Sequence, residues 1–414
     1  MKNQFLGTLL IVGCLSSSVA FAESPIQPGD RIAIIGNTFA DQLRIHGYLE
    51  TLLLQRYRDN PVSIRNLSWA GDMLAARDRP TGFASEESTL RAHKTDVIIA
   101  CFGLGESFAG EEGLAEFKNQ LNTLITSYSG KTYNGKTAVR MILVSPIACE
   151  DLGKLTPGRE KRNQNLEAYT LAMQDVATAT KIPFVNVFET SRYLMDESVG
   201  QNLTDNGIHL NAYGYWAMSH TFYEQLTAYE GVSNQQPWWL RIDAAKTASD
   251  ARGVKISQLN NTADGLRFQV TEQSPPRLRP PTDQPLPAQL EVVRDTLVIE
   301  NLPPGEYSLT IDERPVVTAT AKDWAKGVAI DSSPAHKAVE AYQSVVNDKN
   351  LQFVYGWKAL NQVHIVGERR SSPSGKRLPG EVIAFNKLAN ELDQTLRNSI
   401  ELNTRTWKLL RTSK

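Results

Sequence analysis

Short apolar runs in the first half of the chain constrain its fold most. The runs are rich in β-branched residues and comprise Arg31–Ile35, Val62–Leu67, Asp96–Phe102, Arg140–Ser145 and Ile182–Phe188. Apolar residues recur at helical spacing in the segments between and after them, which are 45–53, Leu114–Ile125, Glu160–Thr178 and Ala212–Tyr229. Continuous apolar strands that alternate with helices are typical of a parallel sheet covered on both faces. We therefore predict a three-layer α/β fold for this half.

The second half has a different pattern. Short alternating stretches such as Gly265–Val270 and Thr296–Glu300 are separated by a Pro-rich break, Ser274–Pro287. This texture predicts a small antiparallel β module. A helical pattern then continues as far as Leu410. The predicted organisation is a signal peptide over 1–22, an α/β domain over 23–236, a β-rich module over 237–322 and a helical C-terminal region over 323–414.

The N-terminus carries an export signal. A positive start and a short apolar run precede Ala20-Phe-Ala22, which indicates a secretory signal peptide cut after Ala22 and a periplasmic or extracellular protein. Ile11-Val-Gly-Cys14 also resembles a lipobox, which would leave Cys14 carrying a lipid anchor. No later apolar run is long enough to span a bilayer. Export would permit a bridge between Cys101 and Cys149, and two buried free thiols are the alternative.

Charge and composition narrow the class of partner. The chain has 44 basic and 45 acidic residues, a net charge of -1, so nothing favours nucleic acid or an anionic membrane surface. The sequence has no nucleotide-binding glycine loop and no metal-ligand cluster of His and Cys, and we predict no cofactor. The basic segment Gly367–Arg377 is interpreted as a solvated loop, or else a lid over an anionic or sugar ligand. For the aromatic segment Phe353–Trp357 we expect core packing, with a ligand surface as the alternative.

Polar motifs follow the predicted strands. Three of them are Gly36–Asp41, Ser68–Asp72 and Gly103–Ser107, and a fourth lies in the later turn Asn202–Trp216, which contains His209. Ligands of parallel α/β sheets bind at the carboxyl ends of the strands. In the turn, Asn206 precedes His209 by three residues, a spacing at which a side chain can hold an imidazole in one tautomer.

These motifs, in their order, resemble the SGNH or GDSL-type hydrolase superfamily. The resemblance covers about Arg31 to Tyr229 and rests on five segments: Ile34-Ile-Gly-Asn-Thr-Phe39, Asn66-Leu-Ser-Trp-Ala-Gly-Asp72, Phe102-Gly-Leu-Gly-Glu-Ser107, Ser145-Pro146 and Thr204-Asp-Asn-Gly-Ile-His209. It implies a flavodoxin-like fold and an exported enzyme that cleaves esters, with carbohydrate O-acyl esters as one substrate class. A small-molecule or glycan ester is then the expected partner.

The resemblance also implies roles for individual residues. Thr38 stands where the family has its nucleophilic Ser; the alternative is a turn residue whose hydroxyl bonds the backbone. Gly71 matches the glycine whose N–H binds the oxyanion. Gly105 replaces the Asn that is the second oxyanion donor, so its backbone N–H or the Ser107 hydroxyl would have to substitute.

His209 matches the family's general base, and Asn206 replaces the Asp that orients it. Asp205 could take the carboxylate role by a shift of one residue, or else form an Asx turn. Asp72 and Glu106, near the predicted mouth, are candidate acids or ligand anchors, with strand-end capping as the alternative. Asn37 is a further candidate acid or ligand anchor.

Three functions follow from these assignments. The first is an ester hydrolase with an atypical Thr, Asn and His constellation. The second is a binding protein for glycans or peptides that has lost catalysis. The third is a cleft in which Glu106 or Asp72 works with His209 on a glycosidic or sulfate-type bond.

Overall fold

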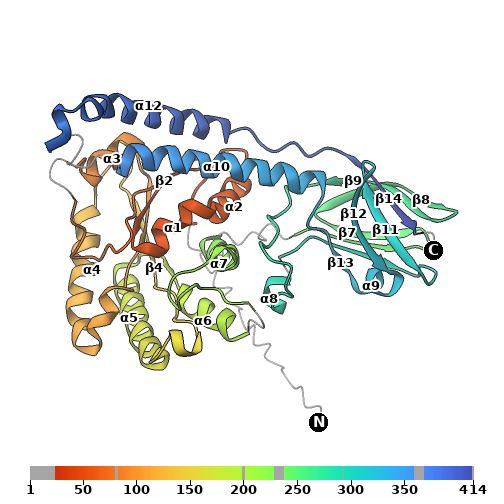
Figure 1. Ribbon diagram of the computed structural model, residues 1–414, viewed down its shortest axis with the longest axis horizontal. Helices are drawn as coiled ribbons and strands as arrows, with labels where there is room; N and C mark the ends of the chain where they lie inside the picture. The colour runs from red at the N-terminus through yellow and green to blue at the C-terminus, as the bar shows by residue number, and fades with distance from the viewer. Residues whose placement is uncertain are drawn as a thin grey trace, which may run out of the picture.

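The computed structural model describes residues 24–79, 83–197, 201–227, 237–291, 293–358 and 368–412. The predicted signal peptide and Cys14 lie outside these ranges. An α/β domain and a β module lie at opposite ends of the molecule, and two long helices, α10 (Pro334–Lys358) and α12 (Pro373–Thr395), run along one side (Figure 1).

A five-stranded parallel sheet forms the centre of the α/β domain. Its strands, in the spatial order β2-β1-β3-β4-β5, are Ser63–Asn66, Arg31–Gly36, Val97–Cys101, Arg140–Val144 and Phe184–Val185. All neighbouring pairs are parallel. Every residue of the central strand β3 is buried, as expected for a strand covered on both faces. The prediction of a flavodoxin-like α/β fold is confirmed.

Helices cover both faces of this sheet and form two separate cores. One core contains α1 (Thr38–His46), α2 (Tyr48–Arg56), α6 (Val187–Glu197) and α7 (Ala212–Thr227). The other contains α3 (Glu86–His93), α4 (Leu114–Tyr128) and α5 (Arg159–Thr180), together with parts of α10 and α12. Alternate residues of each strand enter opposite cores: Ile32 and Ile34 of β1 enter the first, Ala33 and Ile35 the second.

One predicted strand of this domain is shorter than expected and runs into a helix. The run Ile182–Phe188 was expected to be a strand, but only Phe184–Val185 pair with β4, and α6 begins at Val187. Helix α6 buries apolar side chains near both of its ends, among them Phe188 and Leu194. The buried side chains of α6 recur at helical spacing, but most of the helix lies beyond the apolar run Ile182–Phe188. The run alone therefore did not predict the helix.

The β module consists of two sheets around one core. The first has the order β13-β10-β6-β7, with strands Val328–Ala329, Thr296–Glu300, Trp239–Asp243 and Ala248–Arg252. The second has the order β12-β11-β14-β9-β8, with strands Arg314–Thr320, Glu306–Ile311, Arg405–Arg411, Gly265–Glu272 and Val254–Thr262. Leu240 and Ile299 of the first sheet share a buried cluster with Phe268 and Trp407 of the second.

The C-terminal region is divided between the two halves of the molecule. Its helices pack on the α/β domain, whereas β14 lies between β9 and β11 of the β module, so the prediction of helix as far as Leu410 is wrong. Trp407 and Leu409 are buried with more exposed residues between them, a period of two that suits a strand. The predicted basic loop is also largely helical, because Ser372 caps α12 by accepting the Gly375 N–H.

A buried ion pair fixes α10 to the α/β domain. Lys349 is fully buried and pairs with Glu50 of α2, and its ammonium also donates to the Ile64 carbonyl of β2 at 2.9 Å. Asn350 donates to the other Glu50 oxygen at 2.8 Å. Both charges therefore have partners that compensate for their burial.

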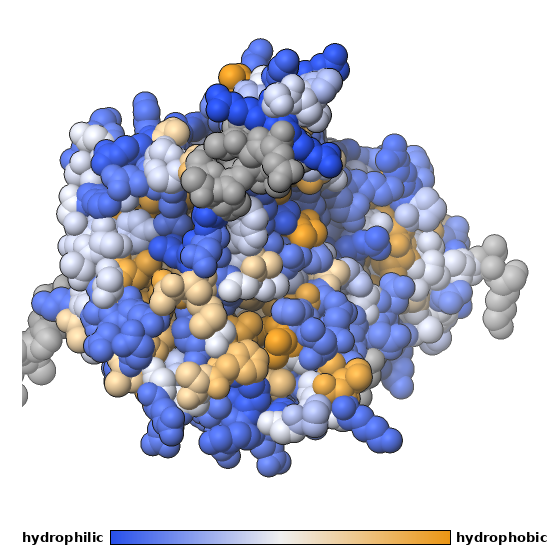
Figure 2. All heavy atoms as spheres, turned by 60° about the vertical axis from the view of Figure 1, so that its left-hand side comes forward, coloured by the Kyte–Doolittle hydropathy of each residue, from blue (hydrophilic) through white to orange (hydrophobic). Residues whose placement is uncertain are grey.

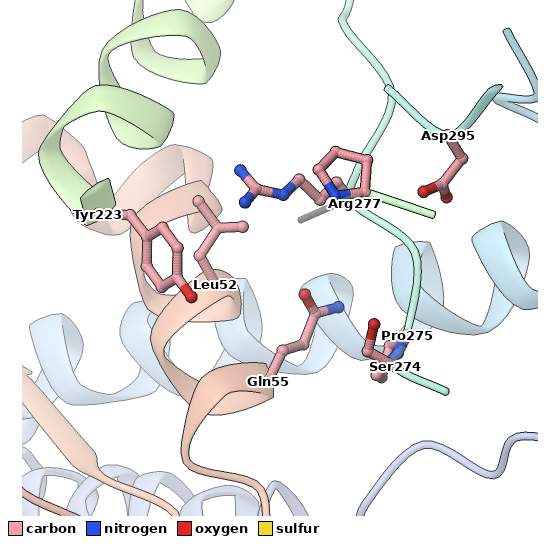
Figure 3. Close-up of a pocket in the computed structure, with 8 residues that line it drawn as sticks. Leu52, Gln55, Tyr223, Ser274, Pro275, Arg277 and Asp295 are labelled. Carbon is pink, nitrogen blue, oxygen red and sulfur yellow. The ribbon is translucent and has the colours of Figure 1, made fainter. Parts of the chain in front are cut away.

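The Pro-rich break is a packed strap between the α/β domain and the β module. Figure 3 shows Arg277 of this segment facing α7 and α2, close to Tyr223 and Leu52. Arg277 donates to His220 Nδ1 at 2.8 Å, and the Leu278 carbonyl accepts from Trp216 Nε1 at 2.9 Å. The strap thereby ties the module to the α/β domain.

The surface of the α/β domain is mixed in character. Seen from the side of α3 and α4, hydrophobic residues lie in small groups between hydrophilic ones (Figure 2). Among the helices that the structure describes, none is long and apolar enough to cross a bilayer.

Candidate active site

The first motif places Thr38 at the start of α1. Gly36 has φ +141, and a Cβ there would lie 2.1 Å from the Cys101 carbonyl oxygen, so the turn out of β1 requires glycine. Asn37 is buried; its backbone N–H donates to that carbonyl at 3.1 Å, and its side chain accepts the Phe39 N–H at 3.1 Å. Asn37, which was predicted as a possible ligand anchor, is therefore the N-cap of α1.

The Thr38 hydroxyl lies beside the predicted oxyanion donor. The backbone N–H of Gly71 donates to Thr38 Oγ1 at 3.2 Å. Gly71 has φ +87, and space is open around it. In the resting state the hydroxyl is thus bonded to the backbone, and Oγ1 is next to the N–H that a tetrahedral intermediate would need.

The third motif leaves no room for the missing Asn side chain. A Cβ on Gly105 would lie 2.7 Å from Met73 Cγ, so Met73 occupies the space that such a side chain would enter. Ser107 is buried, and its hydroxyl donates to the Leu104 carbonyl at 2.7 Å, which removes it as a substitute donor. Of the two predicted substitutes for the second donor, only the backbone N–H of Gly105 is left.

Glu106 joins the second and third motifs. Its two carboxylate oxygens accept the N–H groups of Leu74 at 2.8 Å and Gly103 at 2.9 Å. Burial raises the pKa of Glu106, and the backbone hydrogen bonds oppose that rise. The carboxylate thus holds two loops together.

The carboxylate of Asp72 is likewise occupied by hydrogen bonds within the protein. Arg79 donates to its two oxygens at 2.8 and 2.6 Å, and burial raises the pKa of Asp72 against the effect of Arg79. In the part of the chain that the structure describes, neither Asp72 nor Glu106 is hydrogen-bonded to His209.

Trp69 contacts Lys358, a residue of the C-terminal region that lies at this edge of the sheet. The Arg79 guanidinium and the Lys358 ammonium each lie 4.9 Å from the centre of the Trp69 ring. Lys358, on the last turn of α10, also donates to the buried Asp41 of α1 at 2.6 Å. Sequence reasoning could not find Lys358, because more than 300 residues separate it from Asp41.

Buried Glu150 holds the turn that carries His209. Its carboxylate accepts the N–H groups of Leu203 at 2.8 Å and Thr204 at 2.7 Å and the Thr204 hydroxyl. The Glu150 N–H donates back to the Gly207 carbonyl at 2.8 Å. Sequence reasoning missed Glu150, which lies five residues after the predicted strand Arg140–Ser145.

Asn206 determines the tautomer of His209. Its Oδ1 accepts the backbone N–H groups of His209 at 3.0 Å and Ile208 at 3.3 Å. The Nδ2 amide is therefore the group that faces His209 Nδ1, at 3.0 Å. Because an amide nitrogen can only donate, Nδ1 accepts and the ring proton sits on Nε2. A base that acts through Nε2 needs the opposite tautomer.

Asp205 does not take over the role of Asn206. It is exposed, and its backbone N–H donates to the His209 carbonyl at 2.9 Å. Within the described ranges, the Asp205 side chain makes no hydrogen bond to the His209 ring, and none joins that ring to Thr38. Catalytic hydrogen bonds are often long without substrate and tighten when the substrate binds.

Arg162 of α5 is a further polar group near the third motif. It donates to the Leu104 carbonyl at 2.8 Å, and its guanidinium lies 3.6 Å from the centre of the Phe108 ring. Its Nε and Nη1 are buried without a hydrogen-bond partner among the described residues, and burial lowers the pKa of Arg162. The sequence offered no reason to select this arginine from its helix.

The structure also shows the state of the two cysteines and of possible metal ligands. Cys101 and Cys149 are both buried and free, which is the second of the two predicted alternatives. Burial raises the pKa of both thiols. No group of three or more His, Cys, Asp or Glu residues suited to a metal ion occurs in the described part of the chain.

Comparison with known proteins identifies the class. Residues 29–217 match the GDSL-like Lipase/Acylhydrolase family. The match covers the α/β domain, which is therefore similar to the SGNH/GDSL hydrolase superfamily, and it supports a hydrolase of the class that acts on esters. A search of curated proteins found no match.

Solved structures extend the fold comparison to the whole chain. A gut microbial diltiazem-metabolizing enzyme is similar with a TM-score of 0.69 and 16% identity, over 94% of this chain and 99% of that one. An acetylxylan esterase from Geobacillus stearothermophilus matches with a TM-score of 0.36 and 16% identity, over 49% of this chain and 96% of that one. The first of these shares the arrangement of α/β domain, β module and C-terminal helices.

Proposed function

We propose that the protein hydrolyses short acyl esters of polar alcohols, with Thr38 as nucleophile. The observation that carries this proposal is the 3.2 Å hydrogen bond from the Gly71 N–H to Thr38 Oγ1. It puts a hydroxyl at a helix N-terminus and at the donor that an oxyanion would use. As Oγ1 attacks the ester carbonyl, the Gly71 N–H stops donating to the hydroxyl and donates its hydrogen bond to the developing oxyanion instead.

His209 handles the proton in this scheme. It takes the Thr38 proton on Nε2, gives it to the leaving alcohol, and then activates water against the acyl-enzyme. The resting tautomer is the opposite one, because Asn206 donates to Nδ1. The ring must exchange its proton before each attack, so we expect slow turnover that a carboxylate at position 206 would raise.

Met73 favours a short acyl group. Its side chain lies against Gly105, and beside an oxyanion held by the Gly105 N–H it would restrict the space for the acyl chain. The residues around His209 favour a hydrophilic alcohol, because Asp205, Asn206 and His209 are all exposed and polar. An O-acetylated carbohydrate fits both conditions.

Turnover of aryl acetates and acetylated sugars tests the proposal. The native protein should release acetate, whereas Thr38→Ala and His209→Ala should not. Equal residual turnover in all three proteins would overturn the assignment of these residues.

The rival is a binding protein for glycans or peptides. The observation in its favour is the absence of a hydrogen bond between Thr38 and His209 among the described residues. A thermal-shift screen separates the two functions: stabilisation by glycans or peptides without any ester turnover would favour the rival.

Export is proposed on the sequence alone. The features that support it are the apolar run before Ala22 and the lipobox-like segment ending at Cys14. Mass spectrometry of the native N-terminus would decide between cleavage after Ala22, acylation of Cys14 and an uncut chain. An uncut chain would contradict export.

A further inference from the structure

A cavity lies beside strand β2, between α3 and the two C-terminal helices α10 and α12. Its volume is about 330 Å³, at the lower end of the range for small-molecule sites. Two aromatic residues of α10, Phe353 and Trp357, line it, and their rings are parallel with centres 6.4 Å apart. The lining also includes Arg31, Arg65 and His93.

The charge of this cavity is positive. Arg65 is neutralised by Asp393 at 3.4 Å and also donates to Asn390 at 3.0 Å. In contrast, the Arg31 guanidinium makes one hydrogen bond within the described ranges, to the His93 carbonyl at 3.3 Å, and no ion pair there.

The His93 imidazole adds no charge. It is buried, and burial together with Arg65, Arg31 and Lys349 lowers its pKa well below the usual range. The hydroxyl of Ser63 lies 3.2 Å from its Nε2, and the hydroxyl of Thr95 lies 3.3 Å from its Nδ1. One uncompensated guanidinium therefore faces a space with an aromatic wall.

Trp357 supplies an independent sign of a ligand. Only 4% of this residue is exposed, and among the described residues its indole N–H has no hydrogen-bond partner. A buried donor without an acceptor is costly, and an acceptor atom on a bound molecule would satisfy it.

We propose that this cavity binds a small aromatic carboxylate. Its carboxylate pairs with Arg31, its ring packs on Phe353 and Trp357, and the indole N–H of Trp357 donates to one of its oxygen atoms. The proposal does not depend on the ester hydrolase function, because none of the lining residues belongs to the Thr38 and His209 constellation.

Benzoate is the probe, with benzamide as its neutral analogue and acetate as the anion without a ring. Calorimetric titration of the full protein should show binding of benzoate and at least about tenfold weaker binding of the other two, because each lacks one of the two recognised features. Arg31→Gln should weaken benzoate binding by about tenfold or more. Arg91→Gln removes an exposed arginine of α3 outside the cavity and should leave binding unchanged.

The indole N–H resonance of Trp357 reports the position of the ligand. This resonance is the one that disappears in Trp357→Phe, and it should shift on addition of benzoate both in the native protein and in Thr38→Ala. Equal affinity for benzoate and benzamide, an unshifted resonance, or no benzoate binding at millimolar concentration would each overturn the proposal. If Arg31→Gln does not fold, the comparison of the three probes decides alone.

Discussion

Replacing Asn206 with Asp should convert His209 into an effective base. The substitution is nearly isosteric, so one carboxylate oxygen keeps the backbone N–H groups of His209 and Ile208 that Asn206 Oδ1 now accepts. The second oxygen replaces the amide nitrogen 3.0 Å from Nδ1 and can only accept. The ring proton then moves to Nδ1, and Nε2 is left free to take the Thr38 proton.

The size of the gain follows from the exposure of the pair. In a serine protease, the reverse change of the buried Asp to Asn lowers kcat by roughly 10⁴-fold, equivalent to about 5.5 kcal/mol. Asn206 and His209 are both exposed, so solvent screens part of the effect. We expect Asn206→Asp to raise kcat on an aryl acetate by about 10²- to 10³-fold.

The matched control is Asn202→Asp, which adds the same charge to another exposed position of the same turn. It should change kcat by less than about twofold, because Asn202 does not contact the ring. A rate for Asn206→Asp no higher than that of the native protein would refute the tautomer argument. An equal gain in both variants would assign the effect to charge alone.

Three further predictions concern the nucleophile, the turn and the β module. Thr38→Ser should raise kcat/KM on aryl acetates, because the methyl group that crowds the attack is removed, and a lower value than that of the native protein would count against Thr38 as nucleophile. Glu150→Gln should lower both turnover and the free energy of unfolding, the latter by about 1–3 kcal/mol in urea titration, since its amide nitrogen would oppose the N–H of Leu203 or Thr204; unchanged values would show that the turn does not need this anchor. Burial raises the pKa of Glu272 to about 7, against the effect of Arg405, so the folded state binds the extra proton and stability should fall by a few kcal/mol from about pH 4.5 to pH 7. Urea titrations at several pH values should show this slope in the native protein and a shallower one in Glu272→Gln, and equal slopes would contradict the assignment.

The fold of the α/β domain could be predicted because its signals are local. Each buried strand is a continuous apolar run, and the alternation with helices determines the sheet type. The errors occurred where tertiary packing decides, as in α6, whose first turn lies within an apolar run, and in β14, whose partners β9 and β11 are far away in the chain.

The site was predictable to the extent that its residues follow strand ends. The prediction placed Thr38 and Gly71 at one edge of the sheet, and the structure joins them by a hydrogen bond. It could not find Lys358 or Met73, because their places depend on contacts between distant segments. The orientation of the Asn206 amide also required the structure, because backbone N–H groups select it.

The central claim is that Thr38 forms an acyl-enzyme. The most direct measurement is peptide mass spectrometry of the Asn206→Asp protein after reaction with an aryl phosphonate that traps nucleophilic hydroxyls. We predict a phosphonyl adduct on the peptide that contains Thr38, and its loss in the double variant Thr38→Ala with Asn206→Asp. An adduct on another residue, or full ester turnover in that double variant, would contradict the account.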